Sequence, residues 1–365
     1  MGNNRKQFRQ AVFDRDENNC LVPWCDQNAD DAHHIIERDL WDDGGYVKDN
    51  GASVCNHHHQ YAESNDIPPQ AFYLWAGIND PPTPNTIDTV HTNKWGEEFD
   101  RPPWKNLRER IKYQSSRHLL PLYWHDDETT ADSRMEHDDT GLETVEDFTG
   151  IPLVITHKID GSNCMMVGDD LETPVRARNG SSPTEDMERL HGDGGLYWQQ
   201  EVNQKLPDRL QVFGEWTLAK HSIHYGCNCN PPCEDVGPRL SELTGIENAR
   251  SYFQIFGVFD KEWDMWLSWN RTEAVADELG FPTTPVIHCE DSNDAATYET
   301  EHEARQDLIN HAREVIENGG EGIVVRSKFP FHYDQFSNRL GKYVRENHVT
   351  TDEHWSHTDI TENQI

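Results

Sequence analysis

The chain has 365 residues, of which 66 are acidic and 32 basic, so its formal net charge is −34 at pH 7. No stretch approaches the roughly 18 apolar residues of a membrane-spanning helix, and the N-terminus has no apolar signal core. We therefore expect a cytoplasmic protein without a membrane partner (in the host cytoplasm if it is viral), whose apolar fraction of 35% is sufficient for the cores of two or three domains.

The acidic residues are spread along the chain among aromatic residues, which does not fit a disordered acidic tail. At molar salt the Debye length falls to about 3 Å, so self-repulsion is screened. We interpret the charge as adaptation to high salt, in a halophile or a virus of one. The acidity disfavours nonspecific DNA binding at low salt, although it does not exclude a local basic groove.

Residues 1–78 form the first predicted unit, in which cysteines cluster with histidines. In a chain without a signal peptide this clustering indicates metal binding more than disulfides. Two soft-ligand pairs about thirty residues apart suit a tetrahedral Zn²⁺ site, and the ligands we expect are Cys20, Cys25, Cys55 and His58. The simplest interpretation is that the ion is purely structural and stabilises a small fold.

His34, Asn50 and His59 remain after the zinc is satisfied, and in order and spacing they resemble the His-Asn-His (HNH) nucleases, whose site lies on a ββα unit. The resemblance implies that His34 is the general base, that Asn50 orients it, and that His59 holds a catalytic Mg²⁺ or other divalent ion. The wide Cys-x4-Cys pair and a histidine as fourth zinc ligand depart from the family. The alternative is a module that binds nucleic acid without cleaving it.

Residues 79–111 are rich in proline and read as a linker. Residues 112–355 form the second predicted unit, and residues 356–365 a tail. Short β-rich runs recur in the second unit, with a helical pattern over Ala296–Asn318. This predicts an α+β fold with a largely antiparallel sheet.

Lys158 begins the tetrapeptide Lys158-Ile159-Asp160-Gly161 after the apolar run Ile151–Ile155. A lysine amine becomes a nucleophile when its surroundings offset its charge. The tetrapeptide alone is common, and each segment after it is by itself more typical of an ordinary strand or turn. What is informative is that all of these segments follow Lys158 in one order along the chain. In that order they are Arg178-Asn179-Gly180, Gly214-Glu215-Trp216, Phe253–Asp260, Glu321–Arg326 and Gly341–Arg345.

This ordered set resembles the covalent nucleotidyltransferases, the superfamily of ligases and capping enzymes, and within it the RNA ligases with Lys-x-Asp-Gly-x-Asn. The resemblance spans about Lys112 to Trp355 and includes Arg117-His118-Leu119 and His221–Tyr225. It implies a nucleotidyltransferase (ATP-grasp-like) domain with mainly antiparallel sheets. The pairing with an HNH unit resembles phage-encoded proteins.

The resemblance also implies a mechanism, in which Lys158 attacks the α-phosphorus of ATP and forms lysyl-AMP. AMP then passes to a 5′-phosphate end, and a 3′-hydroxyl displaces it to seal the strand. Cations must be placed in advance, because negative charge develops on phosphate oxygens.

Each remaining site residue has an implied role. Lys342 contacts the α-phosphate, Arg178 the phosphate or ribose, Glu215 the ribose, and Asn163 positions the nucleophile or the RNA end. Glu321 binds Mg²⁺ or Mn²⁺, and Phe256, with Phe253 as the competing choice, stacks on adenine.

Three features depart from this family. His157 stands where glutamate is common, and Val344 where a second lysine is common, with Arg345 beside it. The insert Cys227-x-Cys229-x3-Cys233 is either a second metal site, completed by His224 or Cys289, or an exposed thiol-bearing loop.

The few residues after the last motif leave no room for an OB domain, which favours a minimal RNA ligase acting on RNA or DNA ends. The competing hypotheses are an end-processing nuclease with a degenerate ligase-like domain, a DNA ligase, and a GTP-using capping transferase.

Overall fold

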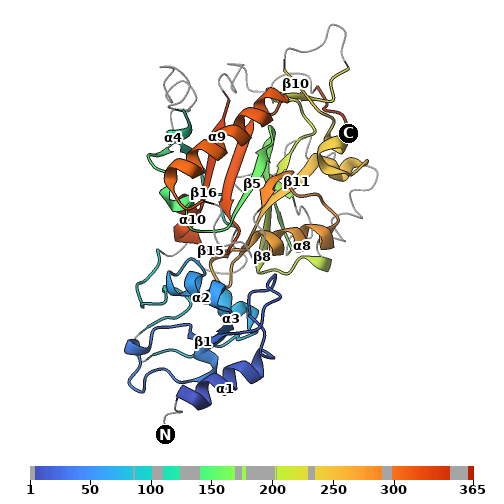
Figure 1. The fold of residues 1–365 in the computed structure, drawn as a ribbon. Coiled ribbons are helices and arrows are strands. Elements are labelled where there is room, and N and C mark those ends of the chain that lie inside the picture. The colour runs from blue at the N-terminus through green and yellow to red at the C-terminus, as the bar shows by residue number, and fades with distance from the viewer. Residues whose placement is uncertain are drawn as a thin grey trace.

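The computed structural model describes residues 5–84, 87–100, 110–123, 140–168, 175–177, 202, 204–228, 235–289, 298–345 and 361–365. They form a small N-terminal body and a larger body of sheets and helices (Figure 1). The predicted α+β class with mainly antiparallel sheets is confirmed. Among the described residues, no helix combines the length and apolar character that crossing a membrane would need.

The N-terminal body is built on a ββα unit. Strand β1 (Asp31–His34) pairs antiparallel with β2 (Gly51–Val54), and helix α2 (Asn56–Glu63) follows directly. Helix α1 (Arg5–Arg15) packs closely on this hairpin. The close packing is possible because residue 51 is glycine, since a Cβ there would lie only 2.3 Å from Val12. Helix α3 (Pro69–Trp75) follows and is almost entirely buried.

The larger body contains two six-stranded sheets. The first has the order β15-β12-β11-β8-β6-β7 and the second β13-β5-β14-β16-β3-β4. The first sheet comprises β6 (Ser162–Val167), β7 (Val175–Ala177), β8 (Leu210–Trp216), β11 (Phe253–Asp260), β12 (Met265–Trp266) and β15 (Phe331–His332). The second comprises β3 (Arg117–Leu119), β4 (Gly141–Leu142), β5 (Leu153–Lys158), β13 (Val286–Cys289), β14 (Gly322–Ser327) and β16 (Leu340–Val344). Within the described strands of these sheets, β3 pairs parallel with β16 and with β4, and the other strand pairs are antiparallel.

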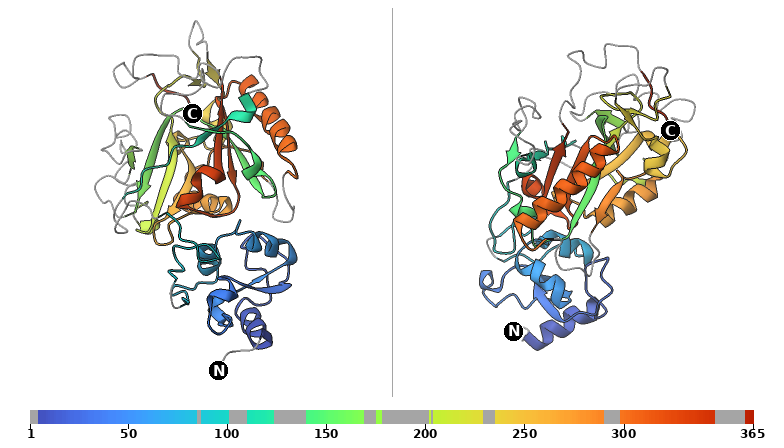
Figure 2. Two further views of the ribbon diagram at one scale, coloured as in Figure 1. Left: turned by 90° about the vertical axis from the view of Figure 1, so that its left-hand side faces the viewer. Right: turned by 45° about the horizontal axis from the view of Figure 1, so that its top comes forward.

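Two long helices cover the sheets: α8 (Trp269–Leu279) packs against β11, and α9 (Glu301–Glu317) against β14 (Figure 2). Helix α9 begins later than the pattern from Ala296 predicts, because Thr300 caps it by accepting a hydrogen bond from the Glu303 amide. The shorter helices are α4 (Leu120–Tyr123), α7 (Leu240–Thr244) and α10 (Phe336–Arg339). A small parallel pair joins β9 (His224–Tyr225) to β10 (Val236–Gly237).

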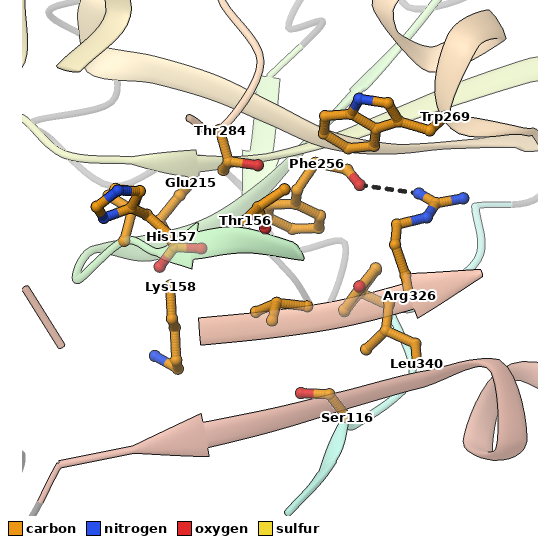
Figure 3. Close-up of a pocket in the computed structure, with 13 residues that line it drawn as sticks. Ser116, Thr156, His157, Lys158, Glu215, Phe256, Trp269, Thr284, Arg326 and Leu340 are labelled. Atoms are coloured by element: carbon orange, nitrogen blue, oxygen red, sulfur yellow. Dashed lines mark hydrogen bonds between the residues drawn. The ribbon is translucent and has the colours of Figure 1, made fainter. Parts of the chain in front are cut away.

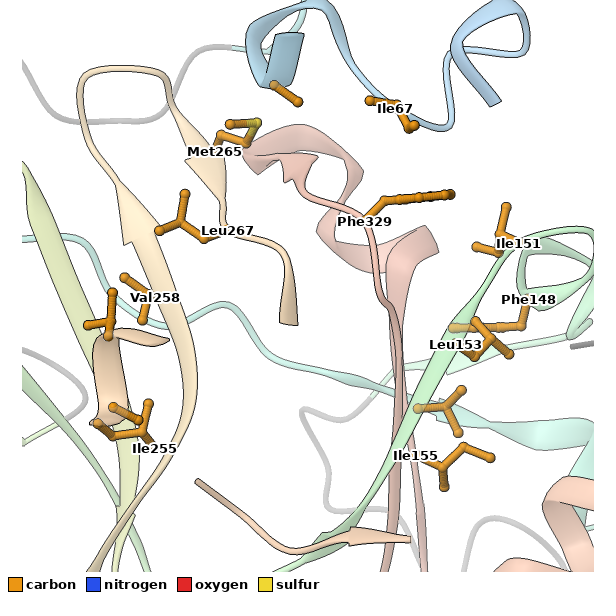
Figure 4. Packing of buried hydrophobic residues seen from close by; sticks show 14 of the residues in the cluster. Ile67, Phe148, Ile151, Leu153, Ile155, Ile255, Val258, Met265, Leu267 and Phe329 are labelled. Atoms are coloured by element: carbon orange, nitrogen blue, oxygen red, sulfur yellow. The ribbon is translucent and has the colours of Figure 1, made fainter. Parts of the chain in front are cut away.

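One continuous hydrophobic core runs from the small body into the larger one. Figure 4 shows Ile67 of the small body facing Phe329, which follows β14. The Phe329 ring lies 4.8 Å from that of Tyr61 and 6.1 Å from that of Trp24. An ion pair of 2.7 Å between Arg339 and Asp66 also crosses the boundary.

Residues 87–100 pack against the small body. The Gln70 side-chain amide donates hydrogen bonds to the carbonyls of Thr89, Val90 and Thr92, at 3.2, 3.0 and 2.9 Å. The buried Lys94 ammonium lies 2.8 Å from the Glu63 carboxylate.

Residues 361–365 pack against the loop of residues 217–226. The Asn363 side chain donates hydrogen bonds to the Thr217 and Ala219 carbonyls and accepts one from the Tyr225 amide.

Candidate active sites

Lys158 and Glu321 form an ion pair where two neighbouring strands meet, with Glu321 buried and Lys158 partly exposed. Lys158 ends β5, Glu321 immediately precedes β14, and Lys158 lies opposite Gly322 in the antiparallel register. The Lys158 ammonium lies 2.7 Å from each carboxylate oxygen of Glu321. On its other side β14 lies close to β16, and this requires glycine at position 322, since a Cβ there would lie 2.0 Å from the Tyr343 carbonyl oxygen.

The charge of Lys158 depends on this pair. Burial alone lowers the pKa of Lys158, but the nearby carboxylates of Glu321 and Glu215 outweigh it, so the pKa lies above its ordinary value. The amine is therefore protonated at neutral pH in the absence of other ligands.

Asp160 holds the turn after Lys158 in place. Its carboxylate accepts a hydrogen bond of 2.6 Å from the Ile223 amide, and its own amide donates to the Tyr225 hydroxyl. Burial and the Glu321 charge raise the pKa of Asp160 to about 7. Gly161 is needed in the same turn, because a Cβ would lie 2.6 Å from the Trp216 carbonyl oxygen.

A pocket of about 590 Å³, including its open mouth, lies between the two sheets (Figure 3). The second sheet contributes Thr156, His157 and Lys158 to its lining, and the first sheet contributes Glu215 and Phe256. The pocket therefore places an aromatic ring and a carboxylate beside the lysine.

The two candidate adenine-stacking residues differ in location. Phe256 lines the pocket, and its carbonyl accepts a 3.2 Å hydrogen bond from buried Arg326. Phe253 is fully buried and packs on Phe281 with ring centroids 5.6 Å apart.

Asn163 and Lys342 lie on strands next to the pocket. Asn163 pairs with Glu215 in the register of β6 and β8, and its side-chain oxygen is buried without a hydrogen-bond partner. Lys342 pairs with Val324, which lines the pocket, in the register of β16 and β14. Arg178 lies outside the described residues.

The positions that depart from the family pattern have clear locations. His157 lines the pocket, and burial lowers its pKa. Val344 is buried opposite Gly322. Arg345 lies 2.6 Å from Asp235, so its guanidinium is already in an ion pair.

Four side chains converge in the small body: Cys20, Cys25, Cys55 and His58, each with one ligand atom within 4.8 Å of the others. The Cys55 and Cys20 sulfurs lie 3.2 and 3.5 Å from His58 Nδ1, and the Cys25 and Cys55 sulfurs are 3.9 Å apart. A hydrogen bond from Cys20 lowers the pKa of Cys55 to about 3, so this thiol is ready to act as a thiolate ligand. The donor set fits Zn²⁺.

A second cluster in the small body contains His33, His59 and Glu63. Glu63 Oε1 lies 3.0 Å from His33 Nδ1 and 3.2 Å from His59 Nε2. The hydrogen bond to His33 lowers the pKa of Glu63. The sequence argument missed His33 and Glu63, although the i,i+4 spacing of His59 and Glu63 on one helix was a usable signal.

His34 and Asn50 are not part of the cluster of His33, His59 and Glu63. The His34 ring stacks on Phe8 at 4.4 Å, its Nε2 is buried without a partner, and burial lowers its pKa to about 4. The buried Asn50 side chain forms hydrogen bonds with the backbone of Ile36 and Gly45. It therefore fixes the loop after β1.

The cysteine insert is described only in part. Cys227 is half-buried and forms no disulfide with a described cysteine, while Cys229 and Cys233 lie outside the described residues. The side chain of Cys289 also lies outside them.

A family model for RNA ligase matches residues 151–344, which is more than half of the chain. A search of curated protein sequences gives no significant match.

Several solved structures are similar to this chain at low scores. An archaeal ATP-dependent RNA ligase is 14% identical with a TM-score of 0.38, over 64% of this chain and 48% of the other. The Naegleria gruberi RNA ligase with PPi is 14% identical with a TM-score of 0.35, over 69% and 64%. A putative ATP-dependent DNA ligase from Aquifex aeolicus is 14% identical with a TM-score of 0.34, over 64% and 49%. The match thus spans about half of the archaeal and Aquifex proteins.

Proposed function

The chain belongs to the RNA ligase family, and on this basis we propose that it is an ATP-dependent polynucleotide ligase, acting on RNA ends through a lysyl-AMP intermediate at Lys158. The supporting observation is that Lys158 lines a pocket between two sheets and pairs with Glu321. A lysine amine and an acidic metal ligand side by side at a pocket suit this chemistry.

The residues divide the work of the first step. Phe256 and Glu215 bind the base and the ribose, and Lys342 and Arg178 offset phosphate charge. Glu321 holds Mg²⁺ or Mn²⁺, and a bound divalent ion supplies positive charge that stabilises the phosphate oxygens. With its carboxylate engaged by a cation, Glu321 no longer raises the pKa of Lys158, and the amine loses its proton more easily.

Adenylate transfer is the direct test. The full chain is incubated at high salt with Mg²⁺ and α-labelled ATP or GTP, and protein-bound label is measured for acid lability. Acid-labile label from ATP that is absent in Lys158→Ala supports the proposal. No label from either nucleotide, or label that persists in that variant, overturns it.

Transfer of the labelled AMP to 5′-phosphorylated RNA and DNA ends then identifies the preferred substrate. Label that comes only from GTP would indicate a capping-type transferase. AMP transfer only to DNA would indicate a DNA ligase.

The small body favours a second function, metal-dependent cleavage of nucleic acid. The supporting observation is the convergence of His33, His59 and Glu63 beside a Cys₃His cluster that suits Zn²⁺. We propose His34 as the general base from its place in the His-Asn-His order of the sequence.

Cleavage of RNA and DNA in Mg²⁺ or Mn²⁺ tests this function, with Glu63→Gln and His34→Ala as variants. Asp14→Asn on the exposed side of α1 is the matched control. We expect both site variants to lose cleavage and the control to retain it. Cleavage at the control rate in both site variants would refute this site, and no cleavage by the wild type would leave the small body as a binding module.

A further inference from the structure

A third group of metal-ligating side chains lies where residues 87–100 meet the larger body. His91 comes from that segment, Asp264 from the turn between β11 and β12, and His332 from the end of β15. One ligand atom of each lies within 4.8 Å of the others. His91 Nδ1 and Asp264 Oδ2 are 3.2 Å apart.

The group is buried and its polar atoms lack partners. His332 is fully buried and Asp264 is 6% exposed. His91 Nδ1, Asp264 Oδ1 and His332 Nε2 are all buried without an aligned hydrogen bond. A buried polar atom without an aligned hydrogen bond is costly, so such atoms on three converging side chains point to a ligand that binds them together.

The surrounding structure holds the three side chains in register. Asp264 directly precedes Met265, which pairs with His332 in the antiparallel ladder of β12 and β15. The Phe99 ring stacks on the His332 ring with centroids 4.1 Å apart. Asp264 itself has a left-handed backbone with φ of 49°, a conformation that non-glycine residues other than Asn and Asp rarely adopt.

We propose that His91, Asp264 and His332 bind a divalent transition-metal ion of the Zn²⁺ class. Two imidazoles and one carboxylate form a typical donor set for this class. A tetrahedral ion with bonds of about 2.0–2.2 Å holds its ligands roughly 3.3 Å apart. His91 and Asp264 are already at that separation.

Metal binding changes one contact of His332. Its Nδ1 now accepts a 3.3 Å hydrogen bond from the Asp334 amide. Coordination through Nε2 requires the ring proton on Nδ1, so this long contact is given up. The shorter bond of 3.0 Å, from the His332 amide to the Gln335 side chain, is unaffected.

The ion would fasten the two bodies together through residues 87–100. This segment is already bound to the small body by Gln70 and by the Lys94–Glu63 pair. A metal bond to His91 fixes its other side to the hairpin of the larger body. The site therefore sets the position of the small body relative to the lysine site.

Zinc content of the full chain tests the proposal. The protein is stripped with a chelator, reloaded with excess Zn²⁺, passed through a desalting column, and analysed by mass spectrometry. Asp264→Asn keeps the side-chain size and tolerates the left-handed backbone. We expect it to hold about one Zn²⁺ per chain fewer than the wild type.

Two further variants make the result decisive. His91→Gln changes a partly exposed side chain and should lose the same equivalent, even if Asp264→Asn folds poorly. His311→Ala removes a histidine that pairs with Asp307 at 3.3 Å on α9, and it should keep the wild-type content. Equal zinc content in the wild type, Asp264→Asn and His91→Gln overturns the proposal.

A second measurement reports on structure instead of content. Zn²⁺ should slow amide hydrogen exchange of residues 87–100 in the wild type and in His311→Ala, but not in Asp264→Asn. Co²⁺ loading, which gives thiolate absorption at the cysteine cluster, verifies that the small body is folded in each variant. Equal protection by Zn²⁺ in the wild type, His311→Ala and Asp264→Asn would contradict a metal ion that fixes residues 87–100 to the larger body.

Discussion

The cysteine cluster of the small body and the lysine site of the larger body hold charged groups in different ways. The cysteine cluster brings together four atoms that can each bind a metal ion, three sulfurs and one nitrogen, from Cys20, Cys25, Cys55 and His58. None of these atoms carries a positive charge when it acts as a ligand, so the cluster suits an external cation. Lys158 and Glu321 have opposite charges and satisfy each other at 2.7 Å. The first arrangement suits a metal ion, whereas the second pairs two opposite charges supplied by the sheets themselves.

The difference follows from the size of each core. The small body has one two-stranded sheet and short helices, and a unit of this size rarely buries enough apolar surface alone. The larger body has two six-stranded sheets and long helices, so it can hold an ion pair and still keep its strands in register. We therefore expect metal removal to destabilise the small body much more than the larger body.

The largest expected effect is that of Lys158→Ala. Loss of the nucleophile should reduce adenylate formation to background, by at least about 10⁴-fold, because no other group forms the bond. Gel detection of labelled protein measures it. Lys205→Ala, an exposed lysine of the same body, is the control and should retain full labelling.

Cys55→Ser comes next and tests the dependence of the small body on metal. Structural zinc contributes about 10–16 kcal/mol to the folding of isolated zinc fingers. We expect this variant to lose the zinc of the cysteine cluster and the protease resistance of residues 5–78. Limited proteolysis with mass spectrometry measures this. If adenylation falls in proportion to the loss of protease resistance, the larger body depends on the zinc of the small body as much as the small body does.

Glu321→Gln separates charge from shape at the lysine site. The lost carboxylate should lower adenylation by about 10²–10³-fold. Because Glu321 raises the pKa of Lys158, its removal should lower that pKa and shift the rising limb of the pH–rate profile to lower pH. A slow variant with an unshifted profile would assign Glu321 to metal binding alone.

The smallest effect concerns the boundary between the regions. The Arg339–Asp66 pair is mostly shielded from solvent on both sides. A double-mutant cycle of Arg339→Ala and Asp66→Ala should give a coupling energy of about 1 kcal/mol in the free energy of unfolding. Additive effects of the two substitutions would show that this pair does not couple the bodies.

The sequence predicted local features of the larger body well. The apolar run before Lys158 forms β5, and the order of motifs matches strands that flank one pocket. Periodicity and turn chemistry were enough, because each strand is specified by its own residues. The same applies to the four residues of the cysteine cluster, whose pair spacing is local.

Contacts between distant segments could not be predicted in this way. His33 and Glu63 meet only after α2 packs beside β1, and His91 meets Asp264 and His332 only after the two bodies assemble. Residues 87–100 read as a linker because their composition is polar and proline lies nearby. Their packing depends on Gln70 and Glu63, which no local pattern connects to them.

The position of residues 361–365 has a practical consequence for handling this protein. Asn363 binds Tyr225, whose hydroxyl accepts a hydrogen bond from the Asp160 amide, two residues after Lys158. An affinity tag or surface tether attached after Ile365 would therefore pull on the turn that carries the nucleophile. The N-terminus lies at the opposite end of the molecule (Figure 1), which makes it the better point for immobilisation or labelling.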